Sequence, residues 1–196
     1  MSETSAHPMA PTRAGRPRSA EAREAVLHAV DEMLVDVGYA AMTMKGIAER
    51  AGVGRQTVYR WWATKAEILM EATTIDAAEA LAFDHSGDPG SDLLRFLAQW
   101  RGFLCDDPSG LAYRALIGEA QHDASVRALV QDADLLGTTS RHLLESLASD
   151  LPGLPDLTLA ADQLTGPLLS HVLLRPAPPD DDMLAGHVAT LLRAWS

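Results

Sequence analysis

Residues 43–62, TMKGIAERAGVGRQTVYRWW, limit the fold of this chain more than any other segment. Ala48 supplies the small side chain that two closely crossing helices need. Gly52, four residues later, can adopt the positive φ that turns the chain between those helices. The segment therefore predicts a helix-turn-helix whose second helix begins near Gly54 and ends around Trp62. The apolar contacts that hold the two helices at their angle are expected from Ile47, Val53 and Val58.

The rest of the chain has helical periodicity and no convincing strand alternation, so the predicted fold is all-α with about nine helices. A long amphipathic helix is expected from Ser19 until Gly38 ends it. Thr64 and Glu67 have the spacing of a capping box, which predicts a helix from there to about Ala82. Further helices are expected at residues 92–105, 109–120, 124–148, 158–174 and 181–195, with a bend at Gly137 and a kink at Pro167.

Three parts are predicted along the chain. Residues 1–18, rich in Pro, Ser, Thr and Arg without a hydrophobic period, are expected to form a disordered basic arm. Residues 19–64 form the expected helix-turn-helix domain and residues 65–196 a helical body. Residues 1–65 contain nine Lys or Arg against seven Asp or Glu, whereas residues 66–196 contain seven against twenty. The chain therefore combines a near-neutral to basic head with an acidic body.

Several classes of protein are excluded by what the sequence lacks. Cys105 is the single cysteine, which rules out an internal disulfide framework and a multi-cysteine metal site; we expect it to be a packed side chain. No apolar run is long enough to span a membrane and no secretory signal is visible, so we expect a cytoplasmic protein with no membrane partner. No G-x-S-x-G turn or nucleotide-binding loop occurs, and His122, His142 and His171 lack the spacing of a local ligand set. We therefore expect no enzyme activity, no cofactor and no metal.

The second helix of the motif carries side chains suited to nucleic acid. Near its N-terminal end lie Arg55, Gln56, Thr57, Tyr59 and Arg60, types that can contact phosphates and base edges in a major groove. In the arm, the Gly-Arg-Pro core of AGRPR (residues 14–18) is similar to an AT-hook, whose extended arginines enter the minor groove of A·T-rich DNA. The alternative interpretations are a helical hairpin of another all-α protein and a solvated tail.

The stretch from Ser19 to Ala72, which includes GYAAMTMKGIAERAGVGRQTVYRWWATKAEIL, resembles the tetracycline-repressor (TetR/AcrR) family of bacterial transcription regulators. The resemblance implies a three-helix DNA-binding head joined by the fourth helix to a ligand-binding body. The position before the recognition helix, often serine in that family, is Gly54 here, which still caps adequately. One ring of the pair Trp61-Trp62 is expected to pack in the head and the other to lie against DNA. The candidate DNA contacts are Thr43, Lys45, Gly54, Arg55, Gln56, Thr57, Tyr59, Arg60, Trp61, Lys65, Arg16 and Arg18.

The resemblance also implies a homodimer that binds double-stranded operator DNA and releases it when a small-molecule effector binds the body. The last two helices are expected to pair with their symmetry mates in a four-helix bundle. The candidate effector-binding residues are Phe96, Trp100, Phe103, Tyr113, Leu116, His142 and Gln163. The candidate interface residues are Leu168, Val172, Leu184, Val188, Leu191 and Trp195. The alternatives are a helical binding protein or enzyme with an incidental helix-turn-helix-like hairpin, and an activator of the same family.

Overall fold

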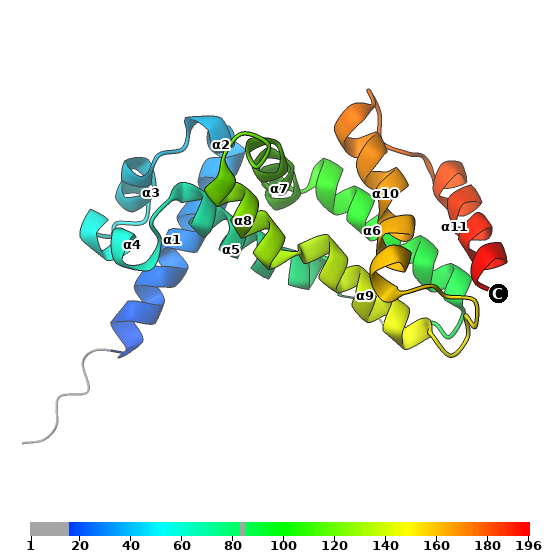
Figure 1. The fold of residues 1–196 in the computed structure, drawn as a ribbon. Helices are drawn as coiled ribbons and strands as arrows, with labels where there is room; N and C mark the ends of the chain where they lie inside the picture. The colour runs from blue at the N-terminus through cyan, green and yellow to red at the C-terminus, as the bar shows by residue number, and fades with distance from the viewer. Residues whose placement is uncertain (1–15, 83–84) are drawn as a thin grey trace, which may run out of the picture.

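The computed structural model describes residues 16–82 and 85–196, and all regular elements within them are helices (Figure 1). The all-α prediction is confirmed. The helices are α1 (Arg16–Asp36), α2 (Gly38–Ala41), α3 (Met44–Arg50), α4 (Arg55–Trp61), α5 (Lys65–Ala80), α6 (Pro89–Asp106), α7 (Pro108–Glu119), α8 (Ala124–Ala133), α9 (Leu135–Leu147), α10 (Leu157–Leu174) and α11 (Asp181–Trp195). They outnumber the predicted helices because the short α2 was missed and the predicted helix 124–148 is two helices.

Helix α1 begins earlier than predicted. It starts at Arg16 rather than Ser19, so the last residues of the predicted arm are helical, and residues 1–15 lie outside the described residues. At its other end α1 stops at Asp36, and Gly38 has a φ of +71°. Glycine reaches this left-handed conformation without strain, so it ends the helix as predicted and leads directly into α2.

Side-chain caps start most of the other helices. The hydroxyl of Thr43 accepts the amide N–H of Gly46 (3.0 Å), and that of Thr64 accepts the amide N–H of Glu67 (3.2 Å). The Glu67 carboxylate in turn accepts the N–H of Ala63 (2.8 Å), one residue before the position expected for a capping box. In the body the same role falls to aspartates, namely Asp88, Asp107, Asp123, Asp156 and Asp180.

The predicted helix 124–148 is broken at Asp134 instead of bending at Gly137. Asp134 has a φ of +36°, and its carboxylate forms an ion pair with Arg141 (2.7 Å). A Cβ added at Gly137 would overlap that carboxylate. Gly137 therefore makes room for the Asp134 side chain, and the break itself falls at the residue that adopts the left-handed conformation.

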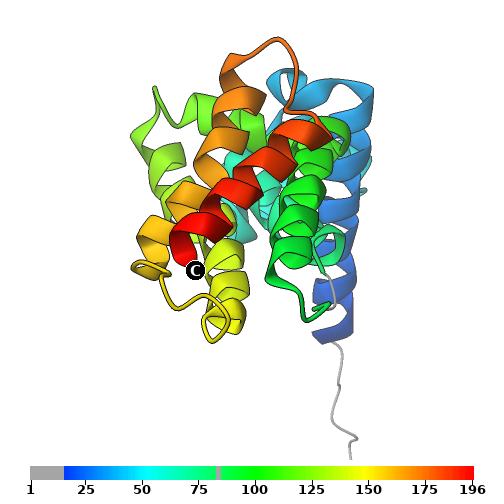
Figure 2. The same cartoon turned by 90° about the vertical axis from the view of Figure 1, so that its right-hand side faces the viewer.

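The helices form a head at one end of the molecule and a body behind it (Figure 1). Helix α5 connects the two, since it packs against α1 of the head and against α7 and α8 of the body. Helix α10 continues through Pro167 and packs on α9 and α6, so the predicted kink stays a prediction. Figure 2 shows α11 lying obliquely across the outer side of the body, where it packs on α6 and α10. No described helix has an apolar stretch long enough to cross a lipid bilayer.

The turn between α6 and α7 brings two backbones together at a glycine. Asp107 caps the start of α7, and Pro108 occupies its first turn, where a missing N–H has no cost. A Cβ added at Gly110 would lie 2.5 Å from the carbonyl carbon of Phe103 and 3.0 Å from the amide nitrogen of Leu104. The start of α7 therefore sits directly on the backbone of α6, which leaves no room for a side chain at this position.

Candidate nucleic-acid interface

The helix-turn-helix predicted for residues 43–62 is present as α3, a turn and α4. Ala48 is buried where the two helices cross, and Gly52 has a φ of +65°. The amide N–H of Val53 donates to the carbonyl oxygen of Ala48 (3.0 Å), which closes the turn. Ile47 and Val58 are fully buried and Val53 is partly buried against the same core, as expected for residues that hold the two helices together. The arrangement leaves the opposite side of α4 free.

The free side of α4 carries the side chains predicted to contact DNA. Arg55, Gln56 and Arg60 are exposed, Tyr59 is 53% exposed, and Thr57 is half-buried. Gly54 starts the helix without a side-chain cap, so the first amide N–H groups of α4 stay available to a phosphate. The exposed residues Thr43 and Lys45 lie at the start of α3. These residues form one surface, made of the starts of α3 and α4, that is polar and cationic.

One carboxylate lies among these cations. The Oε1 atom of Glu49 is 3.7 Å from Nζ of Lys45 and 3.6 Å from Nη2 of Arg55, and all three side chains are exposed. Exposed ion pairs contribute little free energy, about 0–1 kcal/mol. DNA phosphates can therefore replace Glu49 as the partner of both cations.

The two tryptophans after Tyr59 differ in burial, as predicted. Trp62 is 4% exposed, donates its indole N–H to Glu71 (3.0 Å), and carries the Arg23 guanidinium 5.5 Å above its ring. Arg23 in turn forms an ion pair with Glu71 (2.6 Å). Trp61 is half-buried, packs edge-on against Trp62, and has Arg60 over its ring at 5.3 Å. Trp62 thus joins α1, α4 and α5, while the contact of Trp61 with DNA stays a prediction.

Lys65, a predicted DNA contact, is held by the protein itself. Its ammonium donates to the carbonyl oxygen of Tyr39 (3.0 Å) and lies 4.2 Å from the centre of the Tyr39 ring. The hydroxyl of Tyr39 donates to the carboxylate of Glu119 on α7, and burial together with this contact raises the pKa of Tyr39. Sequence reasoning missed Tyr39 and Glu119, because they are far apart in the chain and belong to no motif. They connect α2 of the head with α7 of the body.

Arg16 and Arg18 lie in the first turn of α1. Their backbone is helical, whereas an AT-hook requires an extended chain, so the AT-hook interpretation is not supported by this conformation. The contact of these two arginines with DNA stays a prediction.

Most predicted effector-binding residues form a packed aromatic core instead of an open pocket. Phe96, Trp100, Phe103, Tyr113 and Leu116 are all buried, with the Trp100 ring 5.6 Å from Phe103 and 6.5 Å from Phe96. Burial raises the pKa of Tyr113 to about 12. The indole N–H of Trp100 has no hydrogen-bond partner among the described residues. These five candidates are therefore part of a packed core in this structure.

The remaining body candidates, His142 and Gln163, are not part of that core. His142 and Phe96 line a small cavity of about 220 Å³ between α6 and α9. Gln163 is exposed and accepts the indole N–H of Trp195 (3.2 Å). Burial raises the pKa of the half-buried Cys105 thiol, which disfavours a reactive thiolate.

The residues predicted for the dimer interface are buried within the single chain, so their contact with a partner stays a prediction. They pack against the protein's own helices: Leu168, Val172, Leu184, Val188, Leu191 and Trp195. The apolar face of α11 packs against α6 and α10, which removes the apolar side chains of all three helices from water. The outward faces of α10 and α11 carry small and polar residues, including Gly166, Ser170, Ala185, Gly186 and Ala189. They also carry exposed large apolar side chains, namely Leu159, Leu173, Leu174 and Met183.

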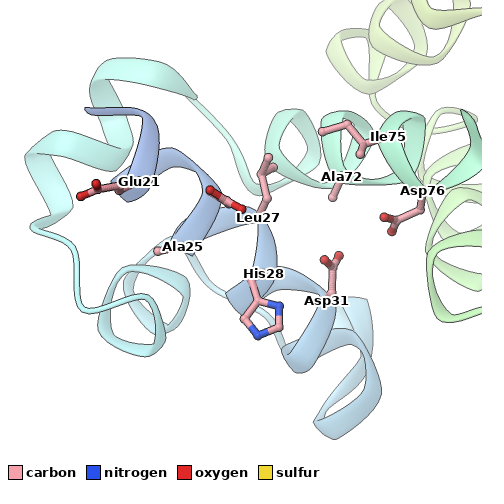
Figure 3. A pocket seen from close by; sticks show the side chains of 9 residues that line it. Glu21, Ala25, Leu27, His28, Asp31, Ala72, Ile75 and Asp76 are labelled. Atoms are coloured by element: carbon pink, nitrogen blue, oxygen red, sulfur yellow. The ribbon is translucent and has the colours of Figure 1, made fainter. Parts of the chain in front are cut away.

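A cavity of about 520 Å³ lies between α1 and α5 (Figure 3), and sequence reasoning did not find it. It holds Asp31 of α1 and Asp76 of α5. The pKa of Asp31 is raised from its ordinary value of 3.8 to about 6. Burial is the largest cause, and the negative charge of Asp76 is the second. The residues come from helices far apart in the sequence, so only the helix packing reveals the site.

The raised pKa of Asp31 predicts a pH-dependent stability. Between about pH 4 and pH 6 the folded chain binds more protons than the unfolded chain, so the free energy of unfolding falls as pH rises through this window. We expect Asp31→Asn to stabilise the protein by about 1–2 kcal/mol at about pH 7.5, after allowance for solvent screening, and to have little effect at about pH 4. Urea unfolding of both proteins at the two pH values measures this. An equal effect at both values would contradict it.

A helix-turn-helix head on an all-helical body is the architecture of a bacterial transcription regulator. The chain belongs to the tetR family of bacterial regulatory proteins. The family model described as "Bacterial regulatory proteins, tetR family" matches residues 26–72. Residues 83–191 match a second family, "Tetracyclin repressor-like, C-terminal domain".

Individual proteins agree with this assignment. The chain is 33% identical over 109 residues to the HTH-type transcriptional regulator YdeS of Bacillus subtilis, covering 56% of this chain and 54% of YdeS. It is 31% identical over 127 residues to the HTH-type transcriptional regulator Rv2250c of Mycobacterium tuberculosis, covering 64% of this chain and 62% of Rv2250c. The matched stretches thus span less than two thirds of these relatives.

A solved structure covers nearly all of the fold. The TetR family transcription regulator SCO0332 superposes with a TM-score of 0.77 and 30% identity, covering 89% of this chain and 98% of that one. A TetR transcriptional regulator from Rhodococcus sp. RHA1 shares the fold with a TM-score of 0.66 and 21% identity, covering 91% of this chain and all of the other.

Proposed function

We propose that this protein is a cytoplasmic, homodimeric repressor that leaves a near-palindromic operator when a small molecule binds. The observation that carries the proposal is the exposed face of α4. It presents Arg55, Gln56 and Tyr59 on a helix whose opposite side is anchored by Val58. Residues 19–64 form the DNA-binding part of this proposal and residues 65–196 the effector-binding and dimerisation part. The proposed function has no enzymatic step.

The geometry of the head suits a major groove. The first residues of α4 can reach base edges, while the free amide N–H groups after Gly54 and the side chains of Thr43 and Lys45 can hold phosphates on either side. Two heads in a symmetric dimer would read half-sites about 34 Å apart, one helical turn of DNA. The near-palindromic operator follows from that symmetry.

The connection between head and body suits an effector-controlled regulator. Helix α5 begins directly after the recognition helix and is tied to the head through the contact of Glu71 with Trp62 and Arg23. A second connection is the hydrogen bond between Tyr39 and Glu119. A ligand that changes the packing of α5 or α7 would move both connections. It would favour release if it binds more tightly to the conformer in which the two heads are wrongly spaced.

The outer faces of α10 and α11 are the proposed dimer interface. Their exposed small residues allow two helices to approach closely, and both helices lie at the end of the body away from the head (Figure 1). This places the interface on the reverse side of the helices from the residues that sequence reasoning selected.

Removal of a side chain from the exposed face of α4 tests the function. We expect Arg55→Ala and Tyr59→Ala each to weaken operator binding by about 1–3 kcal/mol per head, because a base or tightly packed phosphate contact is lost. Their folding should be unchanged, because both side chains are exposed. The measurement is a mobility shift with DNA from upstream of the protein's own gene, at near-physiological salt and with competitor DNA.

Arg175→Ala is the matched control, since it removes an exposed arginine from the end of α10. It should leave DNA affinity unchanged. Unaltered affinity in both head variants would show that α4 is not the recognition helix. A wild-type protein that gives no specific retardation would favour a helical binding protein with an incidental hairpin.

A further inference from the structure

The cavity between α1 and α5 has an apolar wall and acidic side chains, which include Glu21 and Glu24 as well as two aspartates. Leu27, Ala72 and Ile75 provide apolar wall, with Ile75 44% exposed to the open space. Asp31 and Asp76 lie at one end, where their carboxylates point toward one another from the two helices (Figure 3). The volume of about 520 Å³ is in the range of cavities that hold small organic molecules.

No lysine or arginine of the described residues neutralises the negative charge in this cavity. Neither Asp31 nor Asp76 has an ion pair with a lysine or arginine in the part of the chain that the structure describes. Asp76 accepts a hydrogen bond from the hydroxyl of Ser109, but the Oδ1 atom of Asp31 is buried without any hydrogen-bond partner among those residues. A buried acceptor left unpaired is unfavourable, and two facing carboxylates repel each other. A cation bound between the two carboxylates would relieve their repulsion.

The residues around the two carboxylates favour an organic cation over a metal ion. The described residues contain no group of three or more His, Cys, Asp or Glu side chains placed to hold a metal ion. His28, which also lines the cavity, lies 3.4 Å from Glu32, so its ring already has a partner. The apolar wall beside the carboxylates would leave a hydrated metal ion without contacts, whereas it can bury a hydrocarbon.

We propose that this cavity is a binding site for a protonated primary amine with an aromatic or aliphatic body. The ammonium group lies between Asp31 and Asp76 and donates to both carboxylates. The hydrocarbon body lies against Leu27, Ala72 and Ile75.

The location gives such a ligand a direct effect on the head, a consequence that rests on the proposed function. Helix α1 packs against α3, and Arg50 of α3 forms ion pairs with Asp36 (2.8 Å) and Glu32 (3.4 Å) of α1. Helix α5 packs against α7 and α8 of the body. An amine bound between the two helices contacts both. It therefore changes the orientation of the head relative to the body without entering the aromatic core.

Calorimetric titration of the full-length protein without DNA tests the site at neutral pH. The probes are phenylbutylammonium and the neutral phenylbutanol, which have the same hydrocarbon body. We expect one amine per chain and binding of the alcohol weaker by about tenfold or more, because the charge and the N–H donors are missing. Equal binding of amine and alcohol, or no binding of the amine, would overturn the proposal.

Two variants and a control locate the bound amine. Asp31→Asn and Asp76→Asn should each weaken amine binding by about tenfold, because each removes one carboxylate from the cavity. Glu79→Gln removes the same charge from an exposed position of α5 outside the cavity and should leave binding unchanged. Circular dichroism confirms folding, and Asp31→Asn is expected to be at least as stable as wild type. Unchanged amine binding by both cavity variants would overturn the site.

A mobility shift with the amine present separates the site from the proposed function. Release of specifically bound DNA by the amine, with no release by phenylbutanol or from Asp31→Asn, supports coupling to the head. If the amine binds but DNA retention is unchanged, the coupling is overturned. A protein that binds the amine but no DNA would overturn the proposed function and leave the amine site supported.

Discussion

Gly110→Ala is expected to destabilise the protein by about 4 kcal/mol or more, or to prevent folding, because the added methyl group meets backbone rather than flexible side chains. The Cβ would lie 2.5 Å from the carbonyl carbon of Phe103 and closer still to its oxygen. Relief requires α7 to move away from α6, and that movement would open the core around Phe103 and Tyr113. Urea unfolding followed by circular dichroism measures the change.

Gly118→Ala is the control within the same helix. A Cβ at Gly118 meets nothing within 4 Å, so alanine should stabilise the protein by about 0.5–1 kcal/mol through its higher helix propensity. The two substitutions have identical chemistry and opposite expected signs. A Gly110→Ala protein as stable as wild type would show that α7 does not sit on the backbone of α6 as described.

Gly186→Arg is expected to convert the proposed dimer into a folded monomer. A Cβ at this exposed position of α11 meets nothing within 4 Å, so the single chain accommodates the side chain. In a symmetric interface both copies carry the substitution, and each would bury an unpaired guanidinium at a cost of several kcal/mol. Sedimentation velocity should show monomers with wild-type circular dichroism. Affinity for a full operator should fall by about 100-fold or more, because only one head can then bind at a time.

Two further variants serve as controls for Gly186→Arg. Ala128→Arg places the same side chain on an exposed position of α8, a helix that packs on α5 and α7, and should remain dimeric. Val188→Asp puts a charge into the core of the single chain, so it should unfold the protein rather than dissociate it. A stable, DNA-binding dimer of Gly186→Arg would place the interface elsewhere.

Local features of the sequence were sufficient to predict most of the secondary structure and the head. Thr64 caps a helix through a bond that spans three residues, and Gly52 turns the chain by its own backbone conformation. Interactions of this kind depend on neighbours along the chain, so spacing alone reveals them. The same holds for the exposed face of α4, which follows from the buried positions on its other side.

Interactions between distant segments could not be predicted in this way. The break at Asp134 depends on a left-handed backbone conformation and an ion pair with Arg141, whereas the sequence signal pointed to Gly137. The periodicity of α11 indicated which residues are buried, but it does not say whether the covering surface belongs to the same chain or to a partner. Tertiary packing decided that Val188 and Trp195 close the core of their own chain.

By itself, the sequence determined the all-helical class, the helix-turn-helix and the residues that its recognition helix exposes, because these depend on residues a few positions apart. The tertiary structure alone decided that the aromatic residues of α6 and α7 form a packed core. It also placed Asp31 opposite Asp76, two carboxylates on separate helices, in a cavity without a neutralising lysine or arginine among the described residues. Such a site depends on how α1 and α5 pack against each other, which no spacing along the chain encodes.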